Sequence, residues 1–251
     1  MILNILTSII NKKKKININE LPSQGLFYKD DFSIFIKRAQ PSQIDDYKNN
    51  IDLENISSII NLIKKIVQCN TYLSNGYFFE DIKSIDVIYI FLEIVKYTSN
   101  KEVIISFNAN TNIKFESDNF AYFFEDNSKI LEFYSSKDKC FYIDGYKFTL
   151  PSIGVENCLT NFLIKKIDIN SEIIYGDYYY DFIYFLADNN SLSDDKIESL
   201  IQIFNYELEK EESEKVKKMI EMFIPIQKYK LKYENKYFDL TSKVDLVNIW
   251  N

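Results

Sequence analysis

The chain has 251 residues, of which 46% are hydrophobic and 27% are charged. This composition is typical of a folded protein with a sizeable core. A formal net charge of −7 disfavours general nucleic-acid binding, because affinity for phosphate comes mostly from lysine and arginine. The absence of histidine excludes catalytic triads with an imidazole base and metal sites with histidine ligands. Arg38 is the only arginine, so a bidentate guanidinium contact can form at one position only.

The three cysteines, Cys69, Cys140 and Cys158, are odd in number and far apart in the sequence. Such spacing fits neither a disulfide framework nor a zinc knuckle. The sequence therefore predicts free thiols, no structural zinc and no cofactor. Cys69 falls on an apolar helical face, which predicts a place in the core.

An apolar stretch, Met1–Ile10, precedes the lysine run Lys12–Lys15. A secretory signal has its charges before the apolar stretch, so the order here is reversed. Ten residues are also too few to cross a bilayer, and no membrane span is expected. Residues 1–19 are predicted to form an N-terminal arm that either docks on a partner or adds a first strand or helix to the domain. The lysine run itself is interpreted as a solvated linker.

The next segment combines a turn, a strand and two helices. Pro22 and Gly25 predict a turn, and Asn75-Gly76 predicts another turn between the helices. The strand is expected at Phe32–Lys37, where apolar residues alternate, and the helices at Asp52–Cys69 and Asp81–Thr98, where apolar residues recur at helical spacing.

The middle of the chain is rich in short apolar runs between Asn, Asp and Ser clusters, which predicts β-strands. Asp144-Gly145 is a strong signal for a two-residue hairpin turn. The strands are expected at Val103–Phe107, Ile113–Phe115, Ala121–Phe124, Ile130–Tyr134, Cys140–Ile143 and Tyr146–Leu150.

The last hundred residues return to helical periodicity. Ser152 and Ser193 are expected to cap helices, and Pro225 to end the last of them. A final hairpin is predicted around Asn235. The fold class is therefore α+β, mainly helical, with small antiparallel β elements after each helical group. We expect an N-terminal α+β domain over residues 20–150 and a C-terminal helical domain over 151–251.

Paired acids are the first candidates for chemistry: Asp45-Asp46, Asp194-Asp195 and Glu211-Glu212. Two carboxylates could hydrolyse a glycoside, but acids also favour the first turns of helices, and we favour that interpretation. The sequence contains no GxxxxGK[ST], GxGxxG or GxSxG motif, so phosphate-binding loops and nucleophile elbows have no support.

Phe and Tyr together number 39 residues, and core packing accounts for most of them. The densest cluster includes Tyr178, Tyr179 and Tyr180, which we predict to contact a protein partner. Base stacking is disfavoured because no basic groove accompanies this cluster. Trp250 either caps the domain or docks into a partner.

The segment Leu21-Pro22-Ser23-Gln24-Gly25-Leu26-Phe27-Tyr28 resembles the LPSxGxFY signature of T-even-type phage baseplate hub assembly proteins. Further similarity follows in Phe32–Arg38 and in Gln40–Asp46. An acidic position then follows, matched by Glu80-Asp81 or Asp86, and after it an aliphatic stripe that ends at Tyr97-Thr98-Ser99. The resemblance covers about the first hundred residues. Family members often carry a CxxC pair at this point, where this chain has Asn108-Ala109-Asn110-Thr111. The resemblance therefore implies that this chain lacks any metal site built on that cysteine pair.

The resemblance implies a non-enzymatic tail protein that binds hub or tape-measure components in the host cytoplasm, as a chaperone-like factor or a minor structural subunit. Its oligomeric state is left open, as is its presence in the finished virion. A hydrolytic tail enzyme that uses carboxylates and a generic α+β interaction module are the alternatives.

The signature segment also has a physical interpretation of its own. Pro22 favours an extended Leu21, and Gly25 can take a positive φ that closes a tight turn. Leu26, Phe27 and Tyr28 are then directed at an adjoining surface, which is either the chain's own core or a partner. The predicted partner-binding residues of this segment are Leu21, Pro22, Ser23, Gly25, Phe27 and Tyr28.

Overall fold

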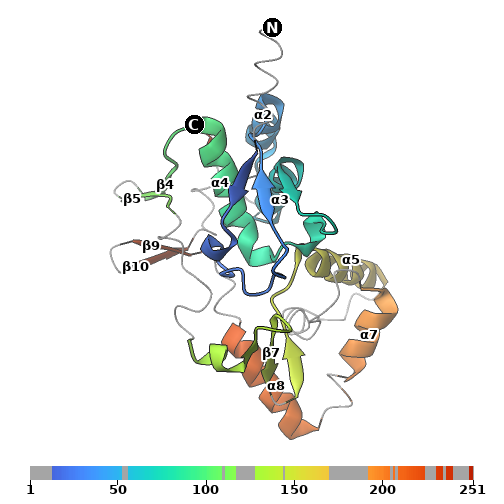
Figure 1. Cartoon of the computed structure of the whole chain (residues 1–251). Helices are drawn as coiled ribbons and strands as arrows, with labels where there is room; N and C mark the ends of the chain where they lie inside the picture. The colour runs from blue at the N-terminus through green and yellow to red at the C-terminus, as the bar shows by residue number, and fades with distance from the viewer. Residues whose placement is uncertain are drawn as a thin grey trace.

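The computed structural model describes residues 13–52, 56–108, 111–116, 128–143, 145–169, 192–203, 206, 209–223, 230–233, 236–239 and 249–250. These residues form an α+β fold of helices and small antiparallel sheets of two or three strands, as the sequence predicts (Figure 1). The predicted strand at 121–124 lies outside the described residues, and so does the tyrosine cluster at 175–184.

The first sheet consists of β1 (Lys14–Ile16), β2 (Ile34–Ile36) and β3 (Thr71–Leu73), in the order β1-β2-β3 with antiparallel neighbours. Ile34 and Ile36 of β2 are fully buried, which confirms the predicted alternation. The interpretation of the lysine run as a linker is wrong, because Lys14 and Lys15 belong to β1, which pairs with β2 from Lys14 to Ile16. Of the alternatives for residues 1–19, a first strand is therefore the one that the structure has here. Ile16 supplies the apolar anchor that holds this strand, since its side chain is buried.

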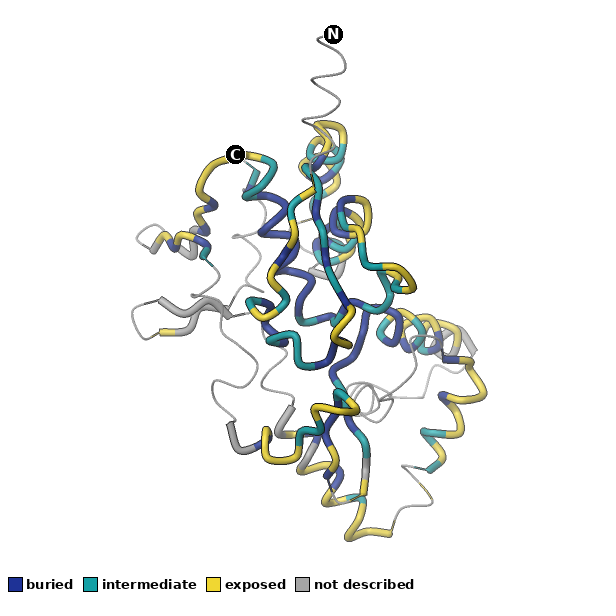
Figure 2. Tube along the Cα trace, in the orientation of Figure 1, coloured by how far each residue is buried: buried dark blue, intermediate teal, exposed yellow. Residues whose placement is uncertain are grey.

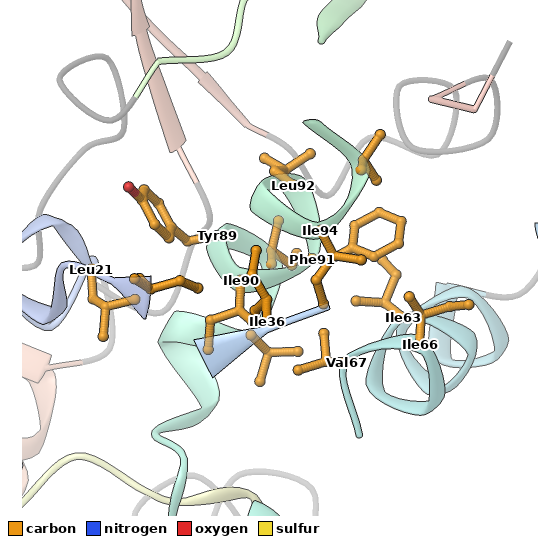
Figure 3. Close-up of a cluster of buried hydrophobic side chains, with 14 of the residues drawn as sticks. Leu21, Ile36, Ile63, Ile66, Val67, Tyr89, Ile90, Phe91, Leu92 and Ile94 are labelled. Atoms are coloured by element: carbon orange, nitrogen blue, oxygen red, sulfur yellow. The ribbon is translucent and has the colours of Figure 1, made fainter. Parts of the chain in front are cut away.

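Three helices accompany this sheet: α2 (Pro41–Asn50), α3 (Ile56–Asn70) and α4 (Val87–Ser99). Every residue of α4 from Val87 to Val95 is buried, as expected of a helix that is apolar on almost all sides. Figure 3 shows side chains of α4 gathered with Ile36 of β2 and with Ile63, Ile66 and Val67 of α3. The largest hydrophobic cluster is therefore organised around α4.

Helix α2 and the environment of Cys69 differ from the predictions. Helix α2 was not expected because its sequence is strongly polar, although Pro41 at its first position is a helix-start signal. Cys69 is exposed, so its predicted place in the core is wrong. The buried side of α3 is centred on Ile63 and Val67, and Cys69 lies about 140° around the helix from it at about 100° per residue.

A second sheet contains β6 (Tyr134–Ser135), β7 (Cys140–Ile143) and β8 (Tyr146–Phe148) in the order β6-β7-β8. The predicted β7–β8 hairpin is confirmed, with Gly145 at φ +86° in its turn. The strand expected at Ile130–Tyr134 is mostly wrong, because Ser128–Phe133 form the 3-10 helix η5. Ile130 is buried there while Leu131 and Phe133 are exposed, which does not follow the two-residue period of a strand.

The remaining elements complete three hydrophobic clusters. Helix α8 (Lys210–Phe223) packs Val216 and Ile220 against the second sheet. Helices α5 (Ile153–Ile169) and α7 (Asp194–Gln202) form the third cluster, and Ser193 caps α7 as predicted. Two further hairpins join β4 (Ile104–Asn108) to β5 (Thr111–Lys114) and β9 (Lys230–Tyr233) to β10 (Lys236–Asp239).

The buried segments run through the centre of the molecule, and the exposed ones form its periphery (Figure 2). Trp250 packs on Phe91 of α4, with ring centroids 6.0 Å apart, so it contributes to the first cluster. Among the described helices, none has both the length and the apolar character of a bilayer span. The predicted division at residue 150 stays a prediction.

Candidate functional site

The segment Leu21–Tyr28 folds as a succession of tight turns after the 3-10 helix η1 (Ile18–Glu20). Leu21 is extended at φ −66° and ψ 151°, as expected for a residue before proline. Its carbonyl accepts the N–H of Gln24 at 2.7 Å, and the Ser23 carbonyl accepts that of Leu26 at 3.2 Å. The backbone therefore satisfies its own hydrogen bonds while the side chains stay available for packing.

Gly25 occupies the left-handed region at φ +71°, which confirms the expected turn. A Cβ atom at this position would lie 3.2 Å from the carbonyl oxygen of Ile18 and 3.3 Å from its Cγ1. Glycine is required here both by the backbone conformation and by the close approach of η1.

The hydrogen-bonding centre of the site is Asp86, whose carboxylate is fully buried. Its Oδ1 accepts the N–H of Ser23 at 2.9 Å. Its Oδ2 accepts the hydroxyl of Ser23 at 2.7 Å and that of Tyr28 at 2.6 Å. Two residues of the signature, five positions apart, thus converge on one carboxylate from a distant part of the chain.

Asp86 is the last residue of the 3-10 helix η3 (Ser84–Asp86) and immediately precedes α4. Its side chain makes no capping bond to α4, although a negative charge at a helix N-terminus is favourable. Burial raises the pKa of Asp86 to about 6, and the hydrogen bonds from Tyr28 and Ser23 and the charge of Lys83 oppose this rise. Burial, together with the charge of Asp86, also raises the pKa of Tyr28 well above its usual value.

Tyr28 connects the site to the segment that leads into α5. Its hydroxyl accepts the backbone N–H of Lys83 at 2.9 Å. The Lys83 ammonium donates to the carbonyl of Leu150 at 3.0 Å, and the Ser84 N–H donates to the carbonyl of Pro151 at 3.0 Å. The buried network therefore orders three segments that are far apart in the sequence.

The two aromatic residues of the signature point into different clusters. Tyr28 stacks on Phe32 with ring centroids 4.2 Å apart and belongs to the cluster around α4. Phe27 lies 5.5 Å from Phe141 and 6.0 Å from Tyr134, within the cluster of the second sheet. The Tyr134 hydroxyl also donates to the carbonyl of Leu26. The segment consequently bridges the first and second hydrophobic clusters.

The predicted site residues of the signature come together, but on the chain's own core. Leu21, Pro22, Ser23, Phe27 and Tyr28 are buried, and Gly25 is partly buried. The interpretation in which the segment is pinned to its own core thus describes the structure, while contact with a partner stays a prediction. Tyr178, Tyr179 and Tyr180 lie outside the described residues.

Sequence reasoning offered Asp86 only as one of three acidic residues at its position, and its role as the anchor was missed. Asp81 instead accepts the backbone N–H of Phe78 at 2.7 Å. The available signal was that Asp86 directly precedes the wholly apolar run Val87–Leu92. A carboxylate in such surroundings requires partners, and the hydroxyls of the signature are suitable donors.

A second contact joins two other parts of the region of resemblance. The backbone N–H of Ala39 donates to the Thr98 hydroxyl at 2.9 Å, and the Arg38 guanidinium lies over the Tyr97 ring, 5.3 Å from its centroid. The segment that follows β2 is thereby fastened to the C-terminal end of α4.

The acid pairs occupy exposed helical positions, apart from Asp46, which is partly buried and lines a small hollow between α2 and α3. Asp194 and Asp195 lie in the first turn of α7, and Glu211 and Glu212 in that of α8, as the helix-start interpretation predicts. Asp45 and Asp46 lie farther along α2, where Asp46 pairs with Lys65 at 2.7 Å. Within the described ranges, no three Asp, Glu or Cys side chains gather closely enough to hold a metal ion.

The geometry of Asp86 suits an anchor better than a reactive group, because the carboxylate has no contact with solvent and is occupied by three donors. Comparison with protein-family models, with curated proteins and with solved structures finds no match for this chain.

Proposed function

We propose that this chain is a non-enzymatic protein that acts in assembling the baseplate hub of a bacteriophage tail, by binding hub or tape-measure components. The observation that supports the proposal is the convergence of Ser23 and Tyr28 on Asp86. Ser23 and Tyr28 belong to the signature, and Asp86 is one of the candidates for the acidic position of the resemblance. A buried network gives a physical reason for the three to occur together.

The contacts of Arg38 and Ala39 with Tyr97 and Thr98 add support. Stretches that resemble the hub assembly family at widely separated points of the sequence meet in space at two places. Such agreement is expected if the resemblance reflects a shared fold rather than a chance match of eight residues. In this proposal the signature maintains the fold, and other surfaces contact the partner.

The first test is disruption of the gene in the phage genome that carries it. We expect tails without a complete baseplate hub in electron micrographs of the lysate, and recovery of normal particles when the wild-type protein is supplied from a plasmid. Normal tails after disruption, or a gene that lies in a bacterial chromosome away from tail genes, would contradict the proposal.

Complementation with variants separates a binding protein from an enzyme. The double variants D45N/D46N, D194N/D195N and E211Q/E212Q remove exposed charges, and each should restore phage yield to within a few-fold of wild type. Tyr178→Ala, if folded, should instead lose its partner, because truncating an interface anchor costs about 2 kcal/mol, or about thirtyfold in affinity. A folded amide variant that abolishes yield while the partner still binds would indicate catalysis.

Phe27→Ala and Tyr28→Ala are poor probes of partner binding, although the sequence nominates both residues. Their side chains are 7% and 4% exposed, so truncating them perturbs the core first. Loss of yield in these variants would report folding. Partner contacts are better tested at exposed positions.

A further inference from the structure

The first sheet has a second face, on the side away from the buried isoleucines. Because successive side chains of a strand alternate between faces, Lys15, Phe35 and Tyr72 lie opposite to Ile16, Ile34 and Ile36. The register pairs Lys15 with Phe35 and Phe35 with Tyr72, so these three form a row across the strands. Lys15 and Tyr72 are exposed, and Phe35 is partly exposed.

Two further lysines converge on this row. The ammonium groups of Lys13 and Lys37 lie 3.8 and 5.4 Å from the centroid of the same ring, that of Tyr72. The Lys15 ammonium lies 5.9 Å from the Phe35 centroid. We name these five residues, Lys13, Lys15, Phe35, Lys37 and Tyr72, the lysine–tyrosine face.

The charges of this face are not balanced within the described part of the chain. No carboxylate of the described residues forms an ion pair with Lys13, Lys15 or Lys37, whereas Lys14, which points to the other face, pairs with Glu93 at 2.6 Å. Two ammonium groups that share one ring repel each other, and a cation–π contact at an exposed site offsets this only in part. An anion from another molecule would relieve the repulsion.

Lysines on edge strands commonly serve to prevent sheets from pairing edge to edge. This role suits Lys13 and Lys15, which lie on or beside the edge strand β1. It does not account for Lys37, which directly follows the central strand β2, nor for the convergence of Lys13 and Lys37 on Tyr72.

We propose that the lysine–tyrosine face binds an extended acidic segment of a partner protein. Lys13 and Lys15 are two residues apart, which in a strand is about 6.7 Å. Alternate side chains of an extended polypeptide have the same spacing, so acids at every second position of the partner can meet both lysines.

A protein segment fits this face better than single-stranded nucleic acid does. Stacking of bases requires open aromatic faces, but lysine ammonium groups already lie over both aromatic rings. A phosphate backbone would also extend past this small face onto a protein of net charge −7, where it would be repelled. A short acidic segment places its charge only where the lysines are.

The test measures binding by fluorescence anisotropy of a short labelled peptide in which Glu and Ser alternate, at low salt. The triple variant K13S/K15S/K37S removes the charges of the face. We expect about a tenfold weaker affinity, the combined effect of three exposed ion pairs, and weaker binding of the wild type as salt increases. The control K215S/K217S/K218S makes the same charge change at exposed positions of α8 and should leave the affinity within about twofold.

Thermal unfolding of both variants verifies that they are folded. Equal loss of binding in the two triple variants would overturn the proposal, because it would mean that only net charge matters. A wild-type protein that binds the Gln–Ser peptide as well as the Glu–Ser peptide would also overturn it. The proposal would also be overturned if the wild type bound oligothymidylate more tightly than the acidic peptide and K13S/K15S/K37S abolished the binding of oligothymidylate. The occupant of the face would then be nucleic acid.

Discussion

Gly25 has the most restrictive backbone position in the signature segment, since a side chain there meets both strain and the η1 carbonyl. Gly25→Val should therefore destabilise the protein more than Gly76→Val does. Gly76 also has a positive φ, +87°, but nothing lies within 4 Å of an added Cβ. A strained backbone position costs about 1–3 kcal/mol, and the contact with Ile18 adds to that cost only at Gly25.

Denaturant unfolding of the two glycine variants beside the wild type measures the difference. Equal losses of unfolding free energy in the two variants would mean that η1 moves away from the added Cβ with no loss of stability. An unchanged Gly25→Val protein would mean that the turn does not require a positive φ.

Asp86 should make stability depend on pH in a direction opposite to that of a salt-bridged carboxylate. Its pKa is raised from 3.8 to about 6, so near pH 5 the folded protein keeps a proton that the unfolded chain has released. The contribution of Asp86 to stability is then fully present below about pH 4 and is lost as pH rises through about 6. Two pKa units correspond to about 3 kcal/mol at most.

Asp86→Asn removes this titration and keeps the shape of the side chain. The free energy of unfolding of the wild type minus that of Asp86→Asn should fall between about pH 4 and pH 7. Other titrating groups cancel in the difference. A difference that is flat or increases with pH would show that the hydrogen bonds from Ser23 and Tyr28 outweigh burial.

At the scale of elements, Phe27 connects the signature segment to the second sheet. Phe27→Ala should cost about 3–5 kcal/mol, as is usual when a buried phenylalanine is truncated. The loss should be greatest near its contacts, Tyr134 and Phe141, so amide hydrogens of β7 and β8 should exchange faster than those of α4.

Phe27→Leu is the matched control, since it keeps an apolar side chain and should retain most of the protection of β7 and β8. Uniform acceleration across α4 and the second sheet would contradict this prediction, because it would mean that the two clusters open as one cooperative unit.

The elements that sequence predicted well are those with strong local signals. The β7–β8 hairpin follows from Asp144-Gly145, the start of α7 from Ser193, and the buried alternation of β2 from Ile34 and Ile36. Helix α2 was missed because polar residues dominate it, and β3 because three residues give too short a pattern. A first strand was one of the alternatives for residues 1–19, but its place at β1 was hidden by the lysines, whose pairing with β2 is a long-range property.

The site illustrates the same limit. The turn at Gly25 could be predicted because it depends on neighbours in the sequence. The partner of Ser23 and Tyr28 could not be predicted in the same way, because Asp86 lies about sixty residues away in sequence. Its position before the apolar run Val87–Leu92 indicates a carboxylate that needs donors, but does not say which donors it meets. Long-range pairing of polar groups is decided by the packed core, which sequence periodicity describes only coarsely.

At the scale of the whole molecule, charge is distributed unevenly. The chain is acidic overall, yet the lysine–tyrosine face gathers three lysines without a carboxylate partner among the described residues. On an acidic body, a local basic face favours approach of an acidic partner toward that face. Binding at such a face would be oriented even where its affinity is modest.

Helix α4 contacts both ends of the described chain, since Ile16 and Ile249 belong to its cluster and Trp250 packs on Phe91. During synthesis, residues 13–99 leave the ribosome long before Trp250 does. Until then, the part of α4 that Trp250 covers is exposed to solvent as apolar surface. Final closure of the first cluster therefore waits for the last described residues, and the nascent chain is most prone to aggregate or to engage a chaperone during that interval.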